Sequence, residues 1–417
     1  MEVNAKERVR MTFNHQEPDR VPIFELTVTN PILSRILGRE LVGTVSGEQK
    51  AASLRASIKG RDARRELINQ NIAGMLEAYT KIGFDMIWIR PTEYLTPVFM
   101  ALNDFIAPNS LFDAEIEEIE PNVFRISSPE WGFWSIEKYS RFSNSCLNIQ
   151  DSIKSNGIHE LERYIEYLEN TSIEVEGNEP IQDGLDGLCL AVASDASIRG
   201  DLFICGNADV AFPTYQPFLD MFLLVMMDRP SLAQRYMEVT TRGTLELLKA
   251  QLKMGVDGVI GGTDICYNVG PLISPSSFRT FFAPYLKMIV DECHKYDVPY
   301  IKHLDGNVMP LMDILVDEIG IDGLHSIEPP AGMNIAKIKE KYGDRLTLLG
   351  NIDCAETLTG DSQEKVIEDV KYILKTASPG GGHVFASSNC IHNGVNYHSF
   401  LTMVESVKKY GVYPVSP

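Results

Sequence analysis

The sequence predicts an α/β protein, a (β/α)8 (TIM) barrel in which residues 1–417 form one domain. One unit recurs: a helical stretch ends at a glycine, a hydrophobic residue and an aspartate follow, and an apolar strand begins. Its glycines are Gly83, Gly255 and Gly320. Glycine commonly ends a helix in the left-handed conformation, and short apolar runs without polar alternation are typical of strands buried on both faces. Alternating units of this kind, with about eight strands, favour a barrel.

The expected elements follow one another closely along the chain. Strands are expected at residues 86–89, 188–193, 202–205, 259–260, 299–302, 324–327, 346–349 and 383–386. Helical periodicity covers residues 231–254, 276–295, 308–319, 335–342, 363–376 and 399–409. This order predicts parallel strands joined by helical crossovers.

Two segments depart from this alternation. Residues 1–80 are expected to form a helical N-terminal extension, and residues 95–185 an insertion. Within the insertion, alternation over residues 124–136 predicts a β-hairpin, and residues 152–175 read as an acidic helix. No Pro- or Ser-rich linker sets the insertion apart, so we expect it near the barrel mouth rather than as a separate domain.

The charge and the apolar runs exclude several classes of partner. The formal net charge is −19, from 57 acidic and 38 basic residues, which disfavours nucleic acid and anionic membranes. There is no run of 18 apolar residues and the N-terminus is charged, so we expect a cytoplasmic protein, compatible with a homo-oligomer. Seven cysteines without a C-x-x-C pair indicate thiols, most of them in the core.

Residues able to bind a metal follow several of the late strands, where a barrel places its reactive groups. They are Asp264, Cys266, His303, Asp305, His325, Glu328, Asn351, Asp353, Cys390 and His392. This number of polar residues at strand ends exceeds what core packing needs.

His303, Asp305 and Gly306 form the most informative motif. Side chains two residues apart on a strand point the same way, so the imidazole and the carboxylate suit a divalent metal such as zinc. Cys390, at the end of the last strand, would complete a His/Asp/Cys site. The alternatives are a metal-free His–Asp hydrogen bond and an inert buried cysteine.

Three further stretches, taken with these residues, resemble the uroporphyrinogen decarboxylase superfamily. They are residues 8–22, which contain P-D-R-V-P, residues 270–275 and residues 348–353. The resemblance runs nearly from end to end and implies the barrel. True decarboxylases carry the arginine-rich M-R-Q-A-G-R after the opening motif, where this chain has F-E-L-T-V-T-N-P with Glu25 and no arginine. They also carry a histidine where this chain places Asn389, so decarboxylation of uroporphyrinogen is not expected.

The cobalamin-dependent methyltransferases of the same superfamily are more similar. They bind zinc through H-x-C and a distant cysteine, which His303 and Cys390 match, whereas Asp305 replaces the middle cysteine. Relatives with H-x-D-G look like enzymes that move a methyl group from a methoxylated or otherwise methylated compound to a corrinoid protein. Because this chain lacks the cobalamin motif D-x-H-x-x-G, cobalamin would be carried by a separate protein.

The resemblance also suggests roles for other residues. It implies zinc on His303, Asp305 and Cys390, with proton transfer or further metal contact from Asp264, Glu328 and Asp305, and with Cys266 as a further candidate. Aromatic residues expected to wall the substrate pocket are Trp88, Tyr94, Phe212, Tyr215 and Tyr267; core packing is the alternative for each. Two other functions stay open: a lyase acting on a non-tetrapyrrole acid, and a metal-free relative.

Overall fold

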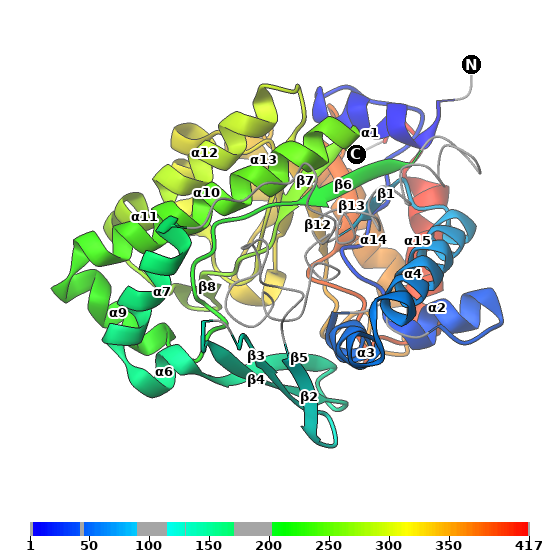
Figure 1. Ribbon diagram of the computed structural model, residues 1–417. Coiled ribbons are helices and arrows are strands. Elements are labelled where there is room, and N and C mark those ends of the chain that lie inside the picture. The colour runs from blue at the N-terminus through cyan, green and yellow to red at the C-terminus, as the bar shows by residue number, and fades with distance from the viewer. Residues whose placement is uncertain (1–2, 42–45, 90–114, 130, 171–201, 416–417) are drawn as a thin grey trace.

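The computed structural model describes residues 3–41, 46–89, 115–129, 131–170 and 202–415. Its centre is a seven-stranded parallel sheet with the strand order β1-β6-β7-β10-β11-β12-β13, curled into a TIM-barrel-like fold with helices around it (Figure 1). The strands are β1 (Met86–Trp88), β6 (Phe203–Asn207), β7 (Gly258–Gly261), β10 (Tyr300–Leu304), β11 (Gly323–Ser326), β12 (Thr347–Ile352) and β13 (His383–Ser387). Seven of the expected strands are confirmed; the expected strand at 188–193 lies outside the described residues.

An eighth segment, which the sequence did not mark as a strand, lies between β13 and β1. Ile23 pairs in parallel with Phe385, and Val28 with Ile391. On the other side, the backbone N–H of Asp85, just before β1, donates to Ile23 O at 2.9 Å. Residues 22–28 therefore close the sheet.

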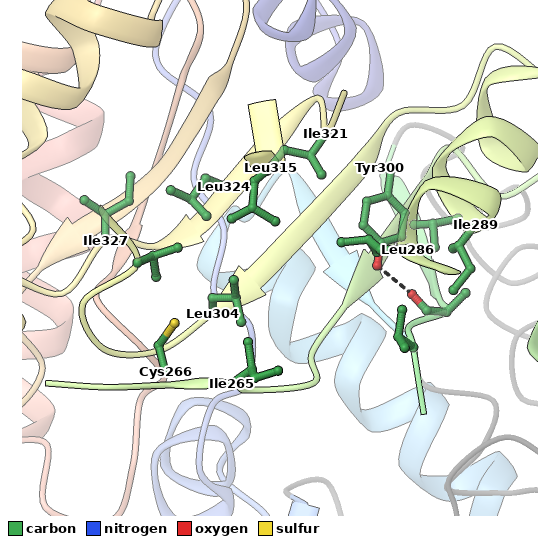
Figure 2. Close-up of a cluster of buried hydrophobic side chains, with 14 of the residues drawn as sticks. Ile265, Cys266, Leu286, Ile289, Tyr300, Leu304, Leu315, Ile321, Leu324 and Ile327 are labelled. Carbon is green, nitrogen blue, oxygen red and sulfur yellow. Dashed lines mark hydrogen bonds between the residues drawn. The ribbon is translucent and has the colours of Figure 1, made fainter. Parts of the chain in front are cut away.

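The barrel interior holds its own apolar cluster, separate from the layer between strands and helices. Its members come from residues 22–28, from six of the strands and from helix α1 (Ala5–Phe13): Val9, Phe24, Leu26, Met86, Trp88, Phe203, Cys205, Ile260, Ile301, Leu349, Val384 and Ala386. The outer layer includes Tyr300, Leu304 and Leu324, which alternate with inward-pointing neighbours on β10 and β11 (Figure 2). Parity along each strand thus fixes which side chains face the interior.

Helices cover the outside of the sheet. Between α1 and β1 the chain forms α2 (Asn30–Leu37), α3 (Ser46–Lys59) and α4 (Arg61–Ile82). Those after β6 are α9 (Leu219–Asp228), α10 (Pro230–Met254), α11 (Pro275–Phe281), α12 (Ala283–His294), α13 (Ile335–Tyr342), α14 (Gln363–Ala377) and α15 (Tyr397–Tyr410). Within the described residues, no helix is long and apolar enough to cross a bilayer.

Two expected helices differ in detail. The one expected at 276–295 is split at Phe282 into α11 and α12, since Pro284 lies in the first turn of α12 and has no N–H to continue a helix. The one expected at 308–319 is a 3-10 turn (Met309–Leu311) followed by a π-helix (Ile314–Ile319). A second 3-10 turn, Pro329–Ala331, follows β11.

The described part of the insertion is larger than a hairpin. It forms an antiparallel sheet of β2 (Glu115–Glu120), β3 (Val123–Ser127), β4 (Trp134–Ser140) and β5 (Ser145–Asp151), followed by α6 (Ser152–Asn156) and α7 (Ile158–Asn170). This sheet lies at the opposite end of the molecule from α1 (Figure 1). Asn148 Nδ2 donates to Gln216 Oε1 at 3.1 Å, which ties β5 to the loop after β6, at the carboxyl ends of the strands.

The aspartates of the recurring unit explain why the unit precedes a strand. Each aspartate side chain accepts a hydrogen bond from one backbone N–H near the start of the neighbouring strand. These hydrogen bonds lie at the end of the barrel near α1. The pairs are Asp85 with Ile23 at 2.8 Å, Asp257 with Ile204 at 3.0 Å and Asp322 with Tyr300 at 2.7 Å. The unit is therefore structural, and its aspartates lie away from the reactive end.

Candidate metal centre

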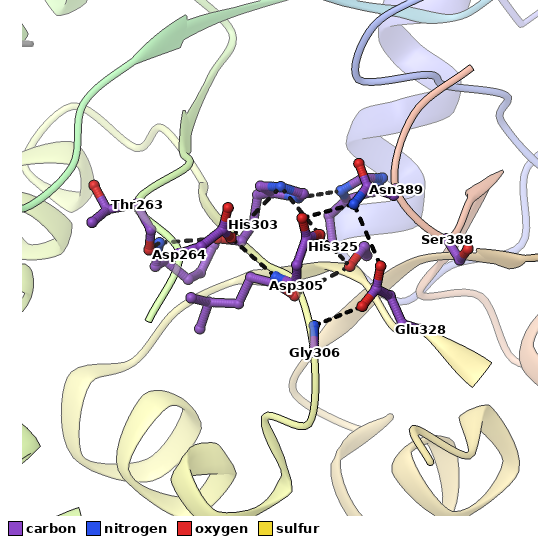
Figure 3. Close-up of polar contacts among 12 residues, drawn as sticks. Thr263, Asp264, His303, Asp305, Gly306, His325, Glu328, Ser388 and Asn389 are labelled. Atoms are coloured by element: carbon purple, nitrogen blue, oxygen red, sulfur yellow. Dashed lines mark hydrogen bonds and ion pairs between the residues drawn. The ribbon is translucent and has the colours of Figure 1, made fainter. Parts of the chain in front are cut away.

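Three predicted side chains meet where β7 and β10 end. Asp264 lies in the loop after β7, His303 is on β10, and Asp305 follows β10 directly. One ligand atom from each lies within 4.8 Å of the others. His303 Nε2 is 3.4 Å from Asp305 Oδ1 and 3.9 Å from Asp264 Oδ1 (Figure 3). His303 points inward because it is two residues from Ile301, a member of the interior cluster.

The turn after Asp305 brings these groups together. Asp305 N–H donates to Asp264 Oδ1 at 3.1 Å, which joins the two loops. Gly306 has a φ of +81°, and a Cβ there would lie 2.6 Å from the carbonyl carbon and oxygen of Tyr267. Glycine is therefore required, both for the left-handed turn and for the close approach of strand β8 (Cys266–Tyr267), which pairs with β9 (Gly270–Pro271).

A third carboxylate, Glu328, joins the group through shared donors. Its Oε2 accepts from Gly306 N–H at 2.7 Å, and its Oε1 lies 3.4 Å from Asn389 Nδ2. The same amide nitrogen donates to Asp305 Oδ2 at 2.7 Å, and Ser326 Oγ donates to Asp305 Oδ1 at 3.1 Å. The site therefore holds three carboxylates close to one imidazole.

Asn389 and Ser326 were not predicted as site residues. Asn389 follows the last strand, β13, and this position at a strand end is the signal by which it could have been found. Its amide nitrogen can donate two hydrogen bonds, which suits it to bridge two carboxylates.

The concentration of negative charge affects the titration of Asp305. Its pKa is raised to about 6: burial is the largest cause, His303 lowers the pKa, and the nearby carboxylates of Asp264 and Glu328 raise it. A cation bound among these groups would remove that repulsion, and the group therefore favours a cation.

A buried ion pair fixes the loop that carries Asp264. Lys302 Nζ donates to Asp209 Oδ2 at 2.6 Å and to the carbonyl oxygens of Thr263 and His303, each at 2.9 Å. Asp209 Oδ2 also accepts from Thr263 N–H at 2.7 Å. Lys302 thereby pairs with Asp209 and holds the backbone just before Asp264 in place.

The structure does not bring Cys390 into this group. Its thiol is hydrogen-bonded to Thr27, and burial, followed by the charge of Cys354 and of nearby carboxylates that include Asp305, raises its pKa to about 12. Cys266 likewise has a pKa raised to about 12, chiefly by burial, and lies in the outer apolar layer (Figure 2). Neither thiol is poised to ionise in this arrangement.

The predicted aromatic residues fall into different places. Trp88 lines the interior beside His303: a Cβ on Gly262 would lie 3.6 Å from Trp88 and 3.8 Å from His303. Tyr215 and Tyr267 are about half exposed, at 52% and 55%, and the Tyr215 hydroxyl donates to Asp264.

Phe212 is buried and packs against Phe222 and Phe282, with ring centroids 5.6 and 6.1 Å apart. Core packing accounts for this residue, as the alternative interpretation expected. Tyr94 lies outside the described residues.

Glu25, noted because it stands where true decarboxylases carry an arginine-rich stretch, does not face the metal centre. It is fully buried and accepts hydrogen bonds from Ser387 N–H at 3.0 Å and Ser387 Oγ at 2.6 Å. Burial raises its pKa to about 8, so the folded state holds a proton that the unfolded chain releases near the ordinary glutamate value of 4.5. The residue is part of the packing between residues 22–28 and β13.

This shift predicts a pH dependence of stability. Because the folded-state pKa is raised, the contribution of Glu25 is fully present below about pH 4.5 and is lost as the pH rises through about 8. Relative to Glu25→Gln, we expect the free energy of unfolding of the parent to fall by on the order of a few kcal/mol between those limits. Urea unfolding at a series of pH values measures the difference. A difference that does not change with pH would show that Glu25 is not buried as a neutral acid.

Comparisons with known proteins agree with this architecture. The uroporphyrinogen decarboxylase (URO-D) family profile matches residues 219–410. The uroporphyrinogen decarboxylase of Coxiella burnetii is 25% identical over 199 residues, which are 46% of this chain and 52% of that protein. That of Thioalkalivibrio sulfidiphilus is 25% identical over 195 residues, 45% of this chain and 52% of that protein. The chain thus spans about half the length of the curated relatives it matches.

A solved structure is similar over almost the whole chain. A methyltransferase from Methanosarcina mazei superposes with a TM-score of 0.62 and 17% identity, covering 98% of this chain and 99% of that one. At this identity the likeness concerns the fold. Asp264, His303, Asp305 and Glu328 all lie in the stretch that the family profile matches. Residues 219–410, which carry the later strands of the barrel and the metal centre, therefore match the uroporphyrinogen decarboxylase family.

Proposed function

We propose that this chain is a metal-assisted methyltransferase that moves a methyl group from a small methoxylated, preferably aromatic, compound to the cobalt of a separate corrinoid protein. The observation that carries the proposal is the convergence of Asp264, His303 and Asp305 at the carboxyl ends of β7 and β10. The fold shared with a methyltransferase over 98% of the chain supports the reaction type. The free thiols of the described cysteines fit the reducing cytoplasm.

The donor set suits zinc or a similar divalent cation. Zinc accepts imidazole nitrogen and carboxylate oxygen as ligands, and catalytic zinc sites use three protein ligands and leave one position open. His303 Nε2 and one oxygen each of Asp264 and Asp305 would supply those three ligands. When bound, the cation would act as a Lewis acid on the ether oxygen of the substrate.

The proposed methyl transfer balances in atoms and electrons. The bond between the methyl carbon and the ether oxygen breaks, its electron pair stays on the oxygen, and the methyl group bonds to cobalt(I) of the partner, which becomes methylcobalt(III). The phenolate that leaves takes a proton. Glu328 lies beside the triad without belonging to it, so we assign this proton transfer to Glu328. Among the described residues, the three carboxylates are bonded to a hydroxyl, an amide and backbone N–H groups, and His303 lies beside them. No arginine or lysine is among these partners, so the site disfavours an acidic substrate.

Trp88, Tyr215 and Tyr267 are the proposed contacts for an aromatic ring. Trp88 lies deepest, beside His303, whereas the two tyrosines are exposed. Tyr215 also contacts Asp264 through its hydroxyl. A ring held between these side chains would place its methoxy group near the three carboxylates, and the corrinoid protein would dock on the same exposed side.

Cys390 and Asp264 compete for the place of third ligand, and two matched variants separate them. Cys390 would have to leave Thr27 and lose its proton against a pKa raised to about 12, whereas Asp264 already lies 3.9 Å from His303 Nε2. We therefore expect Asp264→Asn to weaken zinc binding by at least the 10- to 100-fold typical of an outer-shell loss. Cys390→Ser should change it by less than about threefold. Competition with a chromophoric chelator measures both affinities, and the reverse order would assign the ligand to the thiol.

The proposed reaction is tested by following methylation of free or protein-bound cob(I)alamin spectroscopically with a panel of methoxyarenes. The expected result is methylcobalamin formed in step with the demethylated phenol, with the rate lost in Glu328→Gln and retained in Asp353→Asn, a strand-end acid outside the group. Release of carbon dioxide from an acid substrate without any corrinoid would instead support the lyase.

A further inference from the structure

The second imidazole of the site, His325, touches His303 from inside the barrel. The Nδ1 atoms of the two rings are 2.8 Å apart, and the ring centroids are 5.0 Å apart (Figure 3). The contact follows from the register of the sheet, since His303 on β10 and His325 on β11 are direct partners and both point inward. His325 is on the interior side and is fully buried, with the ring of Phe24 at 5.9 Å.

Two nitrogen atoms 2.8 Å apart hold one proton between them, because two N–H groups would clash and two lone pairs would repel. The Nε2 atom of His303 faces Asp264 and Asp305, which is the side on which a cation would bind. A ring that offers its Nε2 lone pair must carry its proton on Nδ1. The shared proton therefore belongs to His303, and Nδ1 of His325 accepts it.

The environment of His325 agrees with this assignment. A fully buried imidazole is neutral and carries one N–H, which must then be on Nε2. Within the described residues, Nε2 of His325 makes no hydrogen bond of regular geometry.

We propose that His325 is a positioning residue: by accepting the Nδ1 proton of His303, it fixes the tautomer and the orientation that direct the Nε2 lone pair of His303 at Asp264 and Asp305. The proposal rests on the function proposed above in one respect, that the occupant of the group is a divalent cation.

A neutral acceptor has a chemical consequence. Metal-binding histidines usually donate their second N–H to a carboxylate, a backbone carbonyl or water, and a carboxylate makes the ligand more basic. An imidazole acceptor adds no negative charge to a site that already has three carboxylates. The cation would then keep more of its Lewis acidity, as activation of a neutral ether oxygen requires.

The tautomers can be observed directly in the wild-type protein. Nitrogen chemical shifts of 15N-histidine-labelled protein distinguish bare from protonated ring nitrogens. After addition of zinc, we expect Nδ1 of His325 to be bare and its Nε2 protonated, with a coupling through the hydrogen bond to Nδ1 of His303. A proton on Nδ1 of His325 in the zinc-bound protein would overturn the proposal. A chemical shift of His303 Nε2 that does not change on addition of zinc would instead refute the metal centre, so the two failures are distinguishable.

Two substitutions then test the effect on zinc affinity. His325→Leu removes the acceptor, and we expect zinc to bind roughly 10- to 100-fold more weakly, the cost typical of losing an outer-shell partner. His325→Asn places an amide oxygen where Nδ1 was and should recover most of that loss. His383→Asn is the matched control, since His383 is equally buried but is bonded to Ser378 and to Gly350 O rather than to the site. Equal losses in the Leu and Asn variants of His325, or no loss in either, would contradict the assignment.

Discussion

Replacing His303 by alanine is expected to remove zinc binding, with a loss larger than the roughly 10- to 100-fold cost of losing an outer-shell partner. His303 is the only nitrogen ligand in the group, and its Nε2 lies 3.4 Å from Asp305 Oδ1 and 3.9 Å from Asp264 Oδ1. Without it, the two aspartates would hold a cation through carboxylate oxygens alone. Metal analysis after dialysis against a fixed zinc concentration measures the effect.

His392→Ala is the matched control for this variant. His392 also follows a strand end, but its Nε2 is bonded to Cys354 O at 3.0 Å, and we expect its loss to leave zinc binding unchanged. Similar zinc contents in the parent and in His303→Ala would show that the cation binds elsewhere or not at all.

Replacing Asp85 by alanine is expected to lower the free energy of unfolding by about 3–5 kcal/mol, the cost of breaking a buried ion pair by removing one partner. Asp85 is fully buried and bonded to Arg8 Nη1 at 2.7 Å, to Arg20 Nη1 at 2.7 Å and to Ile23 N–H at 2.8 Å. The substitution would leave both guanidinium groups without this partner and release the segment that closes the sheet. The P-D-R-V-P motif thus serves the fold, at the end of the barrel opposite the metal centre.

Asp322→Ala provides the comparison, because Asp322 occupies the same position in its unit. It accepts from Tyr300 N–H at 2.7 Å, but its side chain is 34% exposed, and within the described residues its one ion-pair partner is His294. We expect a loss of about 1 kcal/mol, as for one ordinary hydrogen bond. Urea unfolding curves distinguish the two variants, and equal losses would mean that the arginine pair contributes nothing.

The barrel and the core of the site were predictable because both follow from parity and strand direction. Buried parallel strands lack polar alternation, which located seven of them, and side chains two residues apart share a face, which brought His303 and Asp305 together. The rule that reactive groups follow the strands also marked Asp264 and Glu328.

The pairing of residues 22–28 with the sheet and the direction of the Cys390 side chain were not predictable from the same rules. Residues 22–28 contain Glu25 and Thr27, so they lack the apolar run of the other strands, and their pairing is limited to isolated bridges. Cys390 also follows a strand, but beyond a strand end the backbone no longer alternates, so the direction of its side chain depends on the local turn. The same holds for Asn389, whose bridging of two carboxylates depends on that turn.

Crystals grown with zinc and measured on either side of the zinc absorption edge test the central claim most directly. The metal centre predicts one anomalous peak about 2.0–2.2 Å from His303 Nε2 and from an oxygen each of Asp264 and Asp305. A peak at Cys390 without Asp264, or zinc bound only at surface residues, would contradict it.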